Sequence, residues 1–282
     1  GLFKKIVIAD NSAQIANEIF NNSADYSGST LFLGAMFFTF QIYGDFSGYS
    51  DIAIGTSRLF GFNLKQNFAF PYFSRDIAEF WRRWHISLST WFRDYLYIPL
   101  GGSRGGTWMK VRNTFAIFIV SGFWHGANWT FIVWGALNAL YFLPLLLLNK
   151  NRANIDTVAK GKYLPSFKEF YQIGITFSLT VLAWIFFRAE NIGHAWAYLS
   201  TIFSKSLFTI PIFKISRVYV LQVLLVISLF TIIEWIGRNE QYAIAKLGFE
   251  WNPYLRRSFY FLIILLITVF LGTEQQFIYF QF

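Results

Sequence analysis

The stretch NTFAIFIVSGFWHGANWTFIVWGALNALYFLPLLLLN, Asn113–Asn149, contains no Asp, Glu, Lys or Arg over 37 residues. A helix that crosses the hydrocarbon core of a bilayer needs about 20 predominantly apolar residues. The stretch is therefore long enough to lie in a membrane, and it is interrupted near its first third by His125-Gly126-Ala127-Asn128. Its length and composition predict a membrane protein rather than a soluble domain.

Four further stretches without charged side chains have lengths at or near that of one membrane crossing. They are Tyr26–Gly44 (19 residues), Phe170–Phe187 (18), Val218–Ile233 (16) and Ser258–Thr273 (16). Because backbone groups in lipid must bond internally, these spans are expected to be helices rather than isolated strands. A transmembrane barrel would need segments of about ten alternating residues, and these apolar runs do not alternate. The predicted fold class is all-α: a polytopic helical membrane protein, with residues 1–282 forming one membrane-embedded domain.

The composition excludes several classes of protein. Of 282 residues, 55% are hydrophobic, 22% aromatic and only 14% charged, whereas a soluble domain has about a quarter charged residues. A disordered chain would be poor in aromatic residues and rich in charge, and without cysteine no disulfide scaffold can form. The net charge of +9 alone would fit a nucleic-acid binder, but a mean hydropathy of +0.41 does not suit a soluble basic domain. We expect no nucleic-acid partner.

The basic residues predict which side of the membrane the loops face. Between Arg58 and Arg112, nine Lys and Arg residues stand against three acidic residues, and the loop from Lys150 to Lys168 carries five basic residues. Lys and Arg accumulate in cytoplasmic loops. Both loops are therefore expected in the cytoplasm, so that residues 113–149 enter and leave the membrane on the same side. Membrane lipid is accordingly an expected partner.

A glycine-rich segment carries charged residues just after the first apolar run. Its glycines recur on one predicted helix face: Gly44, Gly48 and Gly55. A face almost without side chains suits close helix packing in lipid. The same segment holds Asp45, Asp51 and Arg58. Ionisable groups in a membrane domain are functional candidates by default, and the alternative is a buried structural ion pair. The sequence leaves both interpretations open.

The segment Asp76–Tyr97, DIAEFWRRWHISLSTWFRDYLY, predicts an amphipathic helix. Asp76 and Glu79 resemble a capping arrangement, and Glu79 can pair with Arg83 at i+4. Six side chains share one continuous predicted face: Trp81, Trp84, His85, Leu88, Phe92 and Tyr95. Arg82, Arg83 and Arg93 lie on the other side. One interpretation is a helix at the membrane surface; the other is that the arginines bind an anionic cytoplasmic donor.

His125 is the ionisable residue inside the long apolar stretch. It follows Arg112 by 13 residues, a rise of about 20 Å in a helix, which places it past the midplane from the cytoplasmic side. Imidazole titrates near neutrality, so it can accept and return a proton in acyl transfer. Gly122 and Gly126 flank His125 and are expected to leave room for a substrate chain. The alternative is a neutral structural histidine packed between Trp124 and Trp129. Three histidines without cysteine give weak support for a metal site, and none is expected.

Three longer motifs resemble signatures of the membrane-bound O-acyltransferase (MBOAT) superfamily. They are Gln41–Gly55 (QIYGDFSGYSDIAIG), Glu79–Pro99 (EFWRRWHISLSTWFRDYLYIP) and Phe123–Asn128 (FWHGAN). The segments Gly1–Asp10 (GLFKKIVIAD) and Phe277–Phe282 (FIYFQF) also fit the bacterial alginate O-acetylation group within it. The resemblance covers nearly the whole chain, and it implies that several N-terminal helices lie outside this sequence.

The resemblance implies a fold and a set of site residues. The fold would be the MBOAT type, with short re-entrant or interfacial helices around a central tunnel. The family's essential histidine falls on His125 and its second motif histidine on His85, a position that holds Asn or Asp in many eukaryotic members. The expected substrate-binding residues are Trp84, Trp124, Asn128, Arg82, Arg83 and Arg93. Asp45 and Asp51 are expected to be structural polar residues.

The function expected from this resemblance is membrane-bound O-acetylation. Acetyl would move from cytoplasmic acetyl-CoA, with no bound cofactor, across the bacterial inner membrane to an extracytoplasmic polysaccharide, and a periplasmic acetyltransferase partner would complete the transfer. Alginate, another exopolysaccharide, peptidoglycan and a teichoic acid that takes D-alanine remain open as acceptors, the last being least like these motifs. The alternatives are a transporter or channel with a polar pathway through Asp45, Asp51, Arg58 and His125, and a non-catalytic scaffold of a polysaccharide export complex.

Overall fold

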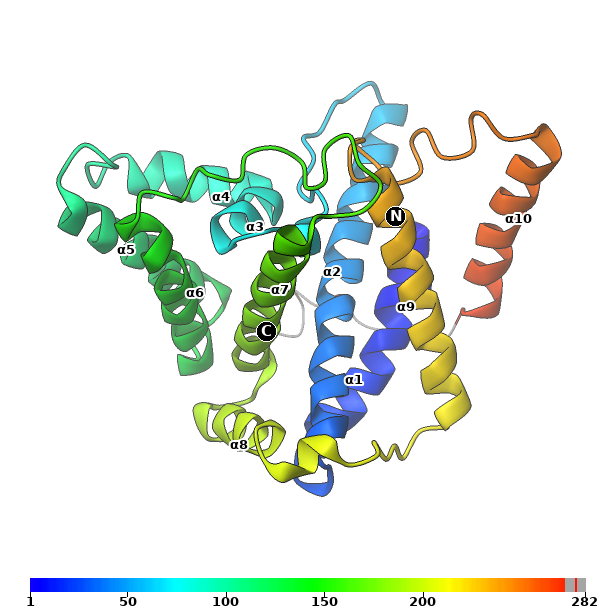
Figure 1. The fold of residues 1–282 in the computed structure, drawn as a ribbon, viewed down its shortest axis with the longest axis horizontal. Helices are drawn as coiled ribbons and strands as arrows, with labels where there is room; N and C mark the ends of the chain where they lie inside the picture. The colour runs from blue at the N-terminus through cyan, green and yellow to red at the C-terminus, as the bar shows by residue number, and fades with distance from the viewer. Residues whose placement is uncertain (272–276, 278–282) are drawn as a thin grey trace. The chain divides into compact units, whose positions relative to one another are not determined.

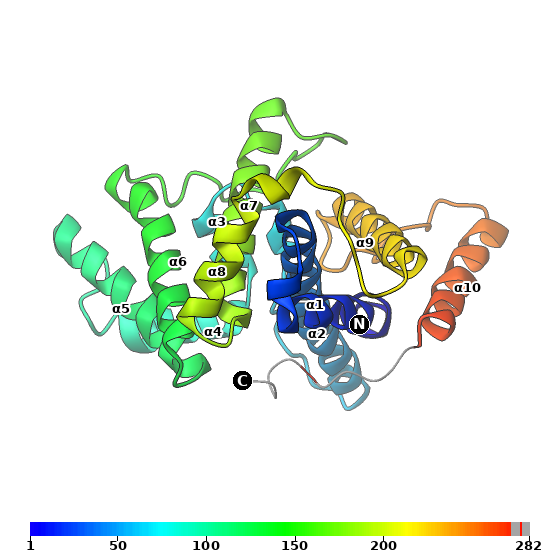
Figure 2. The same cartoon turned by 90° about the horizontal axis from the view of Figure 1, so that it is seen from below.

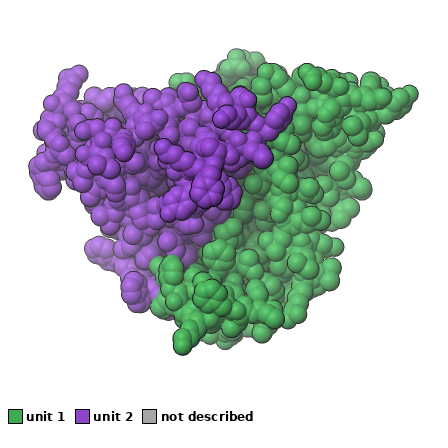
Figure 3. All heavy atoms as spheres, viewed as in Figure 1, with its two compact units in different colours: residues 1–66, 198–282 green, residues 67–197 purple. Residues whose placement is uncertain are grey.

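The chain is helical throughout the part that the structure, a computed structural model, describes: residues 1–271 and 277. No strand occurs in these residues, so the all-α prediction is confirmed (Figure 1). The end of the predicted span Ser258–Thr273, and the segment Phe277–Phe282 apart from its first residue, lie outside the described residues. The helices group into two compact units, residues Gly1–Gln66 with Tyr198–Phe282 and residues Asn67–Ala197 (Figure 3).

The first unit, green in Figure 3, is built on one long helix. Its elements are η1 (Phe3–Asp10), α1 (Asn11–Asn21), η2 (Ser23–Asp25), α2 (Gly28–Leu59), η5 (Lys205–Phe208), α9 (Arg217–Gly237) and α10 (Pro253–Val269). Gly44 and Gly48 of α2 face η1: a Cβ on Gly44 would lie 2.9 Å from the Lys4 oxygen, and one on Gly48 would lie 3.0 Å from the Lys5 nitrogen. This confirms close packing at both glycines, whereas a Cβ on Gly55 would meet no described atom within 4 Å.

Ion pairs join η1 to α2 and α9 inside this unit. Lys5 Nζ lies 2.8 Å from Asp45, and Lys4 Nζ lies 3.0 Å from Asp51 and 3.3 Å from Glu234. The Tyr43 hydroxyl also donates to Glu234 at 2.8 Å. Glu234 and Asp45 are buried, and a buried charge is tolerated when it is paired and hydrogen-bonded. The geometry thus favours the structural interpretation of Asp45 and Asp51.

The second unit, purple in Figure 3, contains both motif histidines. Its elements are η3 (Pro71–Phe73), α3 (Ile77–Arg83), α4 (Ile86–Phe92), η4 (Arg93–Tyr97), α5 (Thr107–His125), α6 (Trp129–Leu147) and α7 (Phe167–Arg188); α8 (Ile192–Ile202) contains the boundary between the units. The long apolar stretch breaks where the sequence predicts, because α5 ends at His125 and α6 begins at Trp129. The two helices lie side by side in both views (Figure 1, Figure 2).

Two glycines bring α5 and α6 together. A Cβ on Gly122 of α5 would collide with the Phe131 carbonyl, and one on Gly135 of α6 would collide with the Phe118 carbonyl. The helices therefore touch backbone to backbone, as small residues allow in membrane helix pairs. The expectation that Gly122 leaves room for a substrate chain is wrong, since the backbone of α6 fills that space.

The segment Asp76–Tyr97 is not one helix, which corrects the prediction of a continuous face. The α3 helix ends at Arg83, His85 adopts φ 44°, and α4 begins at Ile86. In a continuous helix the Arg83 carbonyl would accept from Ser87 N. Here it accepts from Ala69 N at 3.0 Å, while Ser87 N donates to the Asn67 side chain at 3.0 Å. The chain before α3 thus supplies partners for the backbone groups at the break.

Three described helices are long and apolar enough to cross a membrane: α6 (Trp129–Leu147), α7 (Phe167–Arg188) and α9 (Arg217–Gly237). The predicted spans Phe170–Phe187 and Val218–Ile233 lie entirely within α7 and α9, and α6 contains about half of Asn113–Asn149. The predicted span Tyr26–Gly44 lies largely within α2, and the described part of Ser258–Thr273 lies largely within α10.

Two Gly→Ala substitutions, one inside the contact between α5 and α6 and one outside it, are expected to have opposite effects on stability. Within a helix this change normally stabilises by about 1 kcal/mol, and Gly174 of α7 has no described atom within 4 Å of an added Cβ. Gly174→Ala is therefore expected to hold or raise the Tm in detergent. Gly135→Ala is expected to lower stability by about 1–3 kcal/mol, because the Cβ forces the two backbones apart. Equal Tm values for the two variants would contradict this packing.

Candidate active site

The backbone after His125 is fixed by Gly126 and Asn128. His125 ends α5, and Gly126 then adopts φ 158° and ψ 161°, a region that is essentially restricted to glycine. A Cβ on Gly126 would also lie 2.8 Å from the Phe131 ring. The Asn128 side chain caps α6 by accepting from Thr130 N at 3.1 Å, and it donates to the Glu190 carbonyl at 2.8 Å. The loop after His125 is therefore tied to both α6 and the end of α7.

Aromatic rings from three helices surround His125. Trp134 of α6 stands edge-on to the imidazole at 5.2 Å between centroids, and Phe187 of α7 does so at 5.0 Å. Trp124 of α5 lies 5.1 Å away and is 52% exposed. Apolar walls of this kind exclude water and strengthen any hydrogen bond formed inside them. His125 is thus held in a mostly apolar setting by the three consecutive helices α5, α6 and α7.

His85 is positioned by the break between α3 and α4. Its φ of 44° is uncommon for a residue other than glycine and marks a locally strained site. Its ring lies 6.4 Å from that of Phe68. Burial lowers the pKa of His85 to about 4, so the imidazole is neutral at pH 7.

The structure brings the two predicted histidines together through one set of rings. Trp84 lies 5.1 Å from Trp184, Trp184 stacks on Trp134 at 5.8 Å, and Trp184 also contacts Phe187 at 5.2 Å. We call Trp84, Trp134, Trp184 and Phe187 the aromatic cluster. It leads from the residue before His85 to the two rings that touch His125, and the two imidazoles are close enough to interact electrostatically. Trp134, Trp184 and Phe187 were not among the residues predicted from the sequence.

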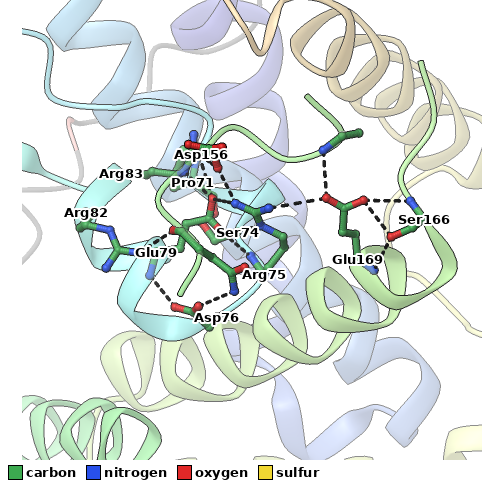
Figure 4. Close-up of polar contacts among 12 residues, drawn as sticks. Pro71, Ser74, Arg75, Asp76, Glu79, Arg82, Arg83, Asp156, Ser166 and Glu169 are labelled. Atoms are coloured by element: carbon green, nitrogen blue, oxygen red, sulfur yellow. Dashed lines mark hydrogen bonds and ion pairs between the residues drawn. The ribbon is translucent and has the colours of Figure 1, made fainter. Parts of the chain in front are cut away.

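The predicted arginines all have partners within the protein: Arg93 pairs with Asp94 at 2.8 Å, and Figure 4 shows Arg82 and Arg83. The capping arrangement is confirmed, because Asp76 accepts from Glu79 N at 2.7 Å. Arg83 pairs with Glu79 at 2.8 Å, also as predicted. Arg82 donates to the carbonyls of Asn151 and Asn154, at 2.8 Å each. Arg82 therefore connects the segment around α3 to the loop after α6, and the two basic loops lie against each other.

Glu79 is the centre of this cluster. It is 1% exposed and receives Arg75 at 3.0 Å from one side and Arg83 at 2.8 Å from the other. Arg75 also lies 3.5 Å from Glu169 of α7 and donates to the Asp156 carbonyl. One buried carboxylate thus pairs with two guanidinium groups that neighbour the histidine-bearing break.

A pocket of about 540 Å³ opens beside these arginines. Its basic lining comes from Arg82, Arg93 and Arg152, with hydroxyls from Ser89 and Thr90. Its apolar lining includes Trp81, Ile86, Phe142 and Ile155. The combination suits a ligand that carries both anionic and apolar parts. Arg152 was not among the residues predicted from the sequence. Its position in the second basic loop, Lys150 to Lys168, was the only feature that could have pointed to it.

Among the described residues, no group of three or more His, Asp or Glu side chains is arranged to hold a metal ion. His194 lies apart from the two motif histidines along the chain, in the first turn of α8. Its Nδ1 accepts from Glu190 N at 3.5 Å.

Known proteins resemble the chain over most of its length. The model of the MBOAT, membrane-bound O-acyltransferase family matches residues 1–186. A probable alginate O-acetylase of Azotobacter vinelandii is 41% identical over 243 residues, covering 86% of this chain and 46% of that protein. A peptidoglycan O-acetyltransferase of Helicobacter pylori is 43% identical over 196 residues, covering 69% and 36%. A teichoic acid D-alanyltransferase of Streptococcus thermophilus is 36% identical over 168 residues, covering 55% and 40%. The chain spans about half the length of the first of these relatives.

Proposed function

Because the chain belongs to the membrane-bound O-acyltransferase family, we propose that it moves acetyl from cytoplasmic acetyl-CoA to a hydroxyl of an extracytoplasmic polysaccharide. The observation that carries the proposal is the convergence of the two motif histidines on one aromatic cluster. Relatives named as an alginate O-acetylase and a peptidoglycan O-acetyltransferase support O-acetylation as the reaction.

The two histidines take different roles in this proposal. His125 is the general base: its imidazole accepts the proton of the acceptor hydroxyl as the oxygen attacks the acetyl carbonyl, and it returns that proton to the departing thiolate. His85, neutral at pH 7, positions a substrate group by hydrogen bonding. Trp84 and Trp124 line the path of the acyl group. Asn128 supports the site by holding the loop after His125.

The donor is proposed to bind on the side of the basic loops. The pocket between α3, α4 and the loop after α6 offers Arg93 and Arg152 to the phosphates of acetyl-CoA, while Phe142 and Ile155 can cover its apolar arm. Arg82 lines this pocket and donates to the carbonyl of Asn151, another lining residue, whereas Arg83 is not in the lining and donates to Glu79. The predicted cytoplasmic side of both basic loops agrees with a cytoplasmic donor.

The acceptor side completes the proposal. The chain would lie in the bacterial inner membrane, with the His125 end facing the periplasm, where it transfers acetyl to a hydroxyl of the polysaccharide and where a separate acetyltransferase acts as its partner. The test is to delete the gene in its own bacterium and measure the alkali-labile acetate of the isolated polysaccharides. Loss of acetate from one polymer, restored by the intact gene, is expected. Unchanged acetylation of every polysaccharide would overturn the proposal.

Substitution of the pocket arginines is expected to change the KM for acetyl-CoA without changing the stability of the protein. Arg93→Gln and Arg152→Gln are each expected to raise the KM for acetyl-CoA by about 10- to 100-fold, because each removes a charged hydrogen bond to phosphate worth about 1.5–3 kcal/mol. Both side chains are exposed, so the Tm is expected to stay within about 1 °C. Arg104→Gln, an exposed change in the same basic segment but outside the pocket, is the matched control. A KM unchanged in both pocket variants would remove this pocket from the donor site.

A further inference from the structure

One buried hydrogen-bond donor in the aromatic cluster is unused. Trp184 of α7 is 2% exposed, and its indole Nε1 has no hydrogen-bond partner among residues 1–271 and 277. An indole N–H can only donate and cannot rotate to a new direction. Buried donors without a partner are rare in folded proteins, and each needs a physical explanation.

A half-buried tryptophan near the cluster, Trp81, does not share this property. Trp81 Nε1 donates to the Asn138 side chain at 3.2 Å, and Asn138 in turn donates to the Trp134 carbonyl at 2.8 Å. The unit therefore does supply an acceptor to an indole at a neighbouring position. For the Nε1–H of Trp184, by contrast, the described residues provide no acceptor.

The position of Trp184 indicates which group could use the donor. Phe187 contacts both Trp184 and His125, with centroid distances of 5.2 Å and 5.0 Å, and Trp134 also contacts both. Trp184 also contacts Trp84, the residue before His85, at 5.1 Å. A reacting carbonyl must lie within reach of both the general base and a donor for its oxygen. Trp184 thus packs against rings that lead to both histidines, in an apolar environment where such a hydrogen bond is strong.

We propose that Trp184 Nε1–H donates a hydrogen bond to the acyl carbonyl oxygen during transfer, an inference that rests on the proposed acyl-transfer function. The acceptor hydroxyl oxygen forms a bond to the carbonyl carbon while His125 takes the hydroxyl proton. The carbonyl π electrons move onto oxygen, which the indole N–H stabilises. They then return as the C–S bond breaks, and the thiolate leaves with the proton from His125. Thioester and alcohol thus become ester and thiol.

The sharpest test replaces Trp184 by 3-benzothienylalanine, which keeps the shape of the indole but has sulfur in place of N–H. Purified, reconstituted protein is assayed with labelled acetyl-CoA and a soluble polysaccharide acceptor. The expected result is a fall in kcat of about 10²-fold, the usual cost of an oxyanion donor, with the KM for acetyl-CoA unchanged. The Tm should not fall, because no hydrogen bond within the protein is lost. Trp184→Phe should show the same direction in kcat.

Tyr198→Phe is the matched control. It removes a buried donor that does have a partner, since the Tyr198 hydroxyl donates to the Leu31 carbonyl at 2.7 Å. It is expected to lower the Tm and to leave kcat of the folded protein unchanged. Wild-type kcat in the benzothienylalanine protein would overturn the role of Trp184 while acyl transfer itself stands. An inactive wild type under every donor and acceptor condition would instead overturn the proposed function.

Discussion

Replacing His125 with alanine is expected to reduce the rate of acyl transfer by about 10²–10⁴-fold, the usual contribution of a general base. The imidazole touches Trp134 and Phe187, so its removal also leaves a small cavity in the cluster. The measurement is the rate of labelled acetyl transfer by the purified protein, divided by the fraction that is folded and correctly inserted. His125→Gln, which keeps more of the side-chain volume, should lose a similar factor.

His194→Ala is the control for the loss of a histidine. His194 interacts with the turn before α8, and its ring nitrogen accepts from Glu190 N. We expect its transfer rate to stay within about twofold of the wild type, because the His194 ring is not part of the aromatic cluster. Wild-type transfer by a folded His125→Ala protein would leave His125 with a structural role only.

Glu79→Gln is expected to cause the largest loss of stability, about 3–5 kcal/mol. Glu79 is buried and pairs with both Arg75 and Arg83. The substitution keeps the size of the side chain but leaves two guanidinium groups without their shared counter-ion. Because Arg75 and Arg83 hold residues on either side of α3, the break at His85 should loosen as well. The measurement is thermal unfolding in detergent, together with proteolysis of residues 67–86.

Asp25→Asn provides a control in which the N–O distance of the ion pair is similar but the carboxylate is exposed. Asp25 lies 2.7 Å from Lys214, and its side chain is 59% exposed. Exposed pairs contribute about 0–1 kcal/mol, so the Tm should barely change. A Tm loss for Glu79→Gln as small as that for Asp25→Asn would show that Glu79 does not hold this cluster together.

The break at residues 125–129 was readable from the sequence, whereas the break at residues 84–85 was not. Gly126 and Asn128 interrupt an apolar stretch with residues that end and begin helices, so the local signal was sufficient. Around His85 the apolar residues keep a helical period through the break. The break depends instead on Asn67 and Ala69, which bond to the backbone on both sides of it. Such tertiary hydrogen bonds leave no periodic pattern in the segment that they change.

In the candidate site, too, some residues could be predicted from the local sequence and others depend on tertiary packing. His125 and His85 stand out because ionisable residues are rare in apolar or aromatic segments. Trp184 and Phe187 lie in an apolar run where each aromatic residue looks like its neighbours, and their proximity to His125 arises from the packing of α7 against α6. The roles of Arg82 and Arg83 likewise depend on Asn151, Asn154 and Glu79, partners that are set by the fold.

The most direct test of acyl transfer through His125 uses vesicles that contain the protein in one orientation. Labelled acetyl-CoA is supplied on the side of the basic loops, and a hydroxyl-bearing oligosaccharide is enclosed on the other side. We predict that ester-linked label accumulates on the oligosaccharide with wild-type protein and not with His125→Ala. Label that crosses the membrane without forming an ester, at equal rates in both proteins, would contradict acyl transfer and indicate a transport pathway.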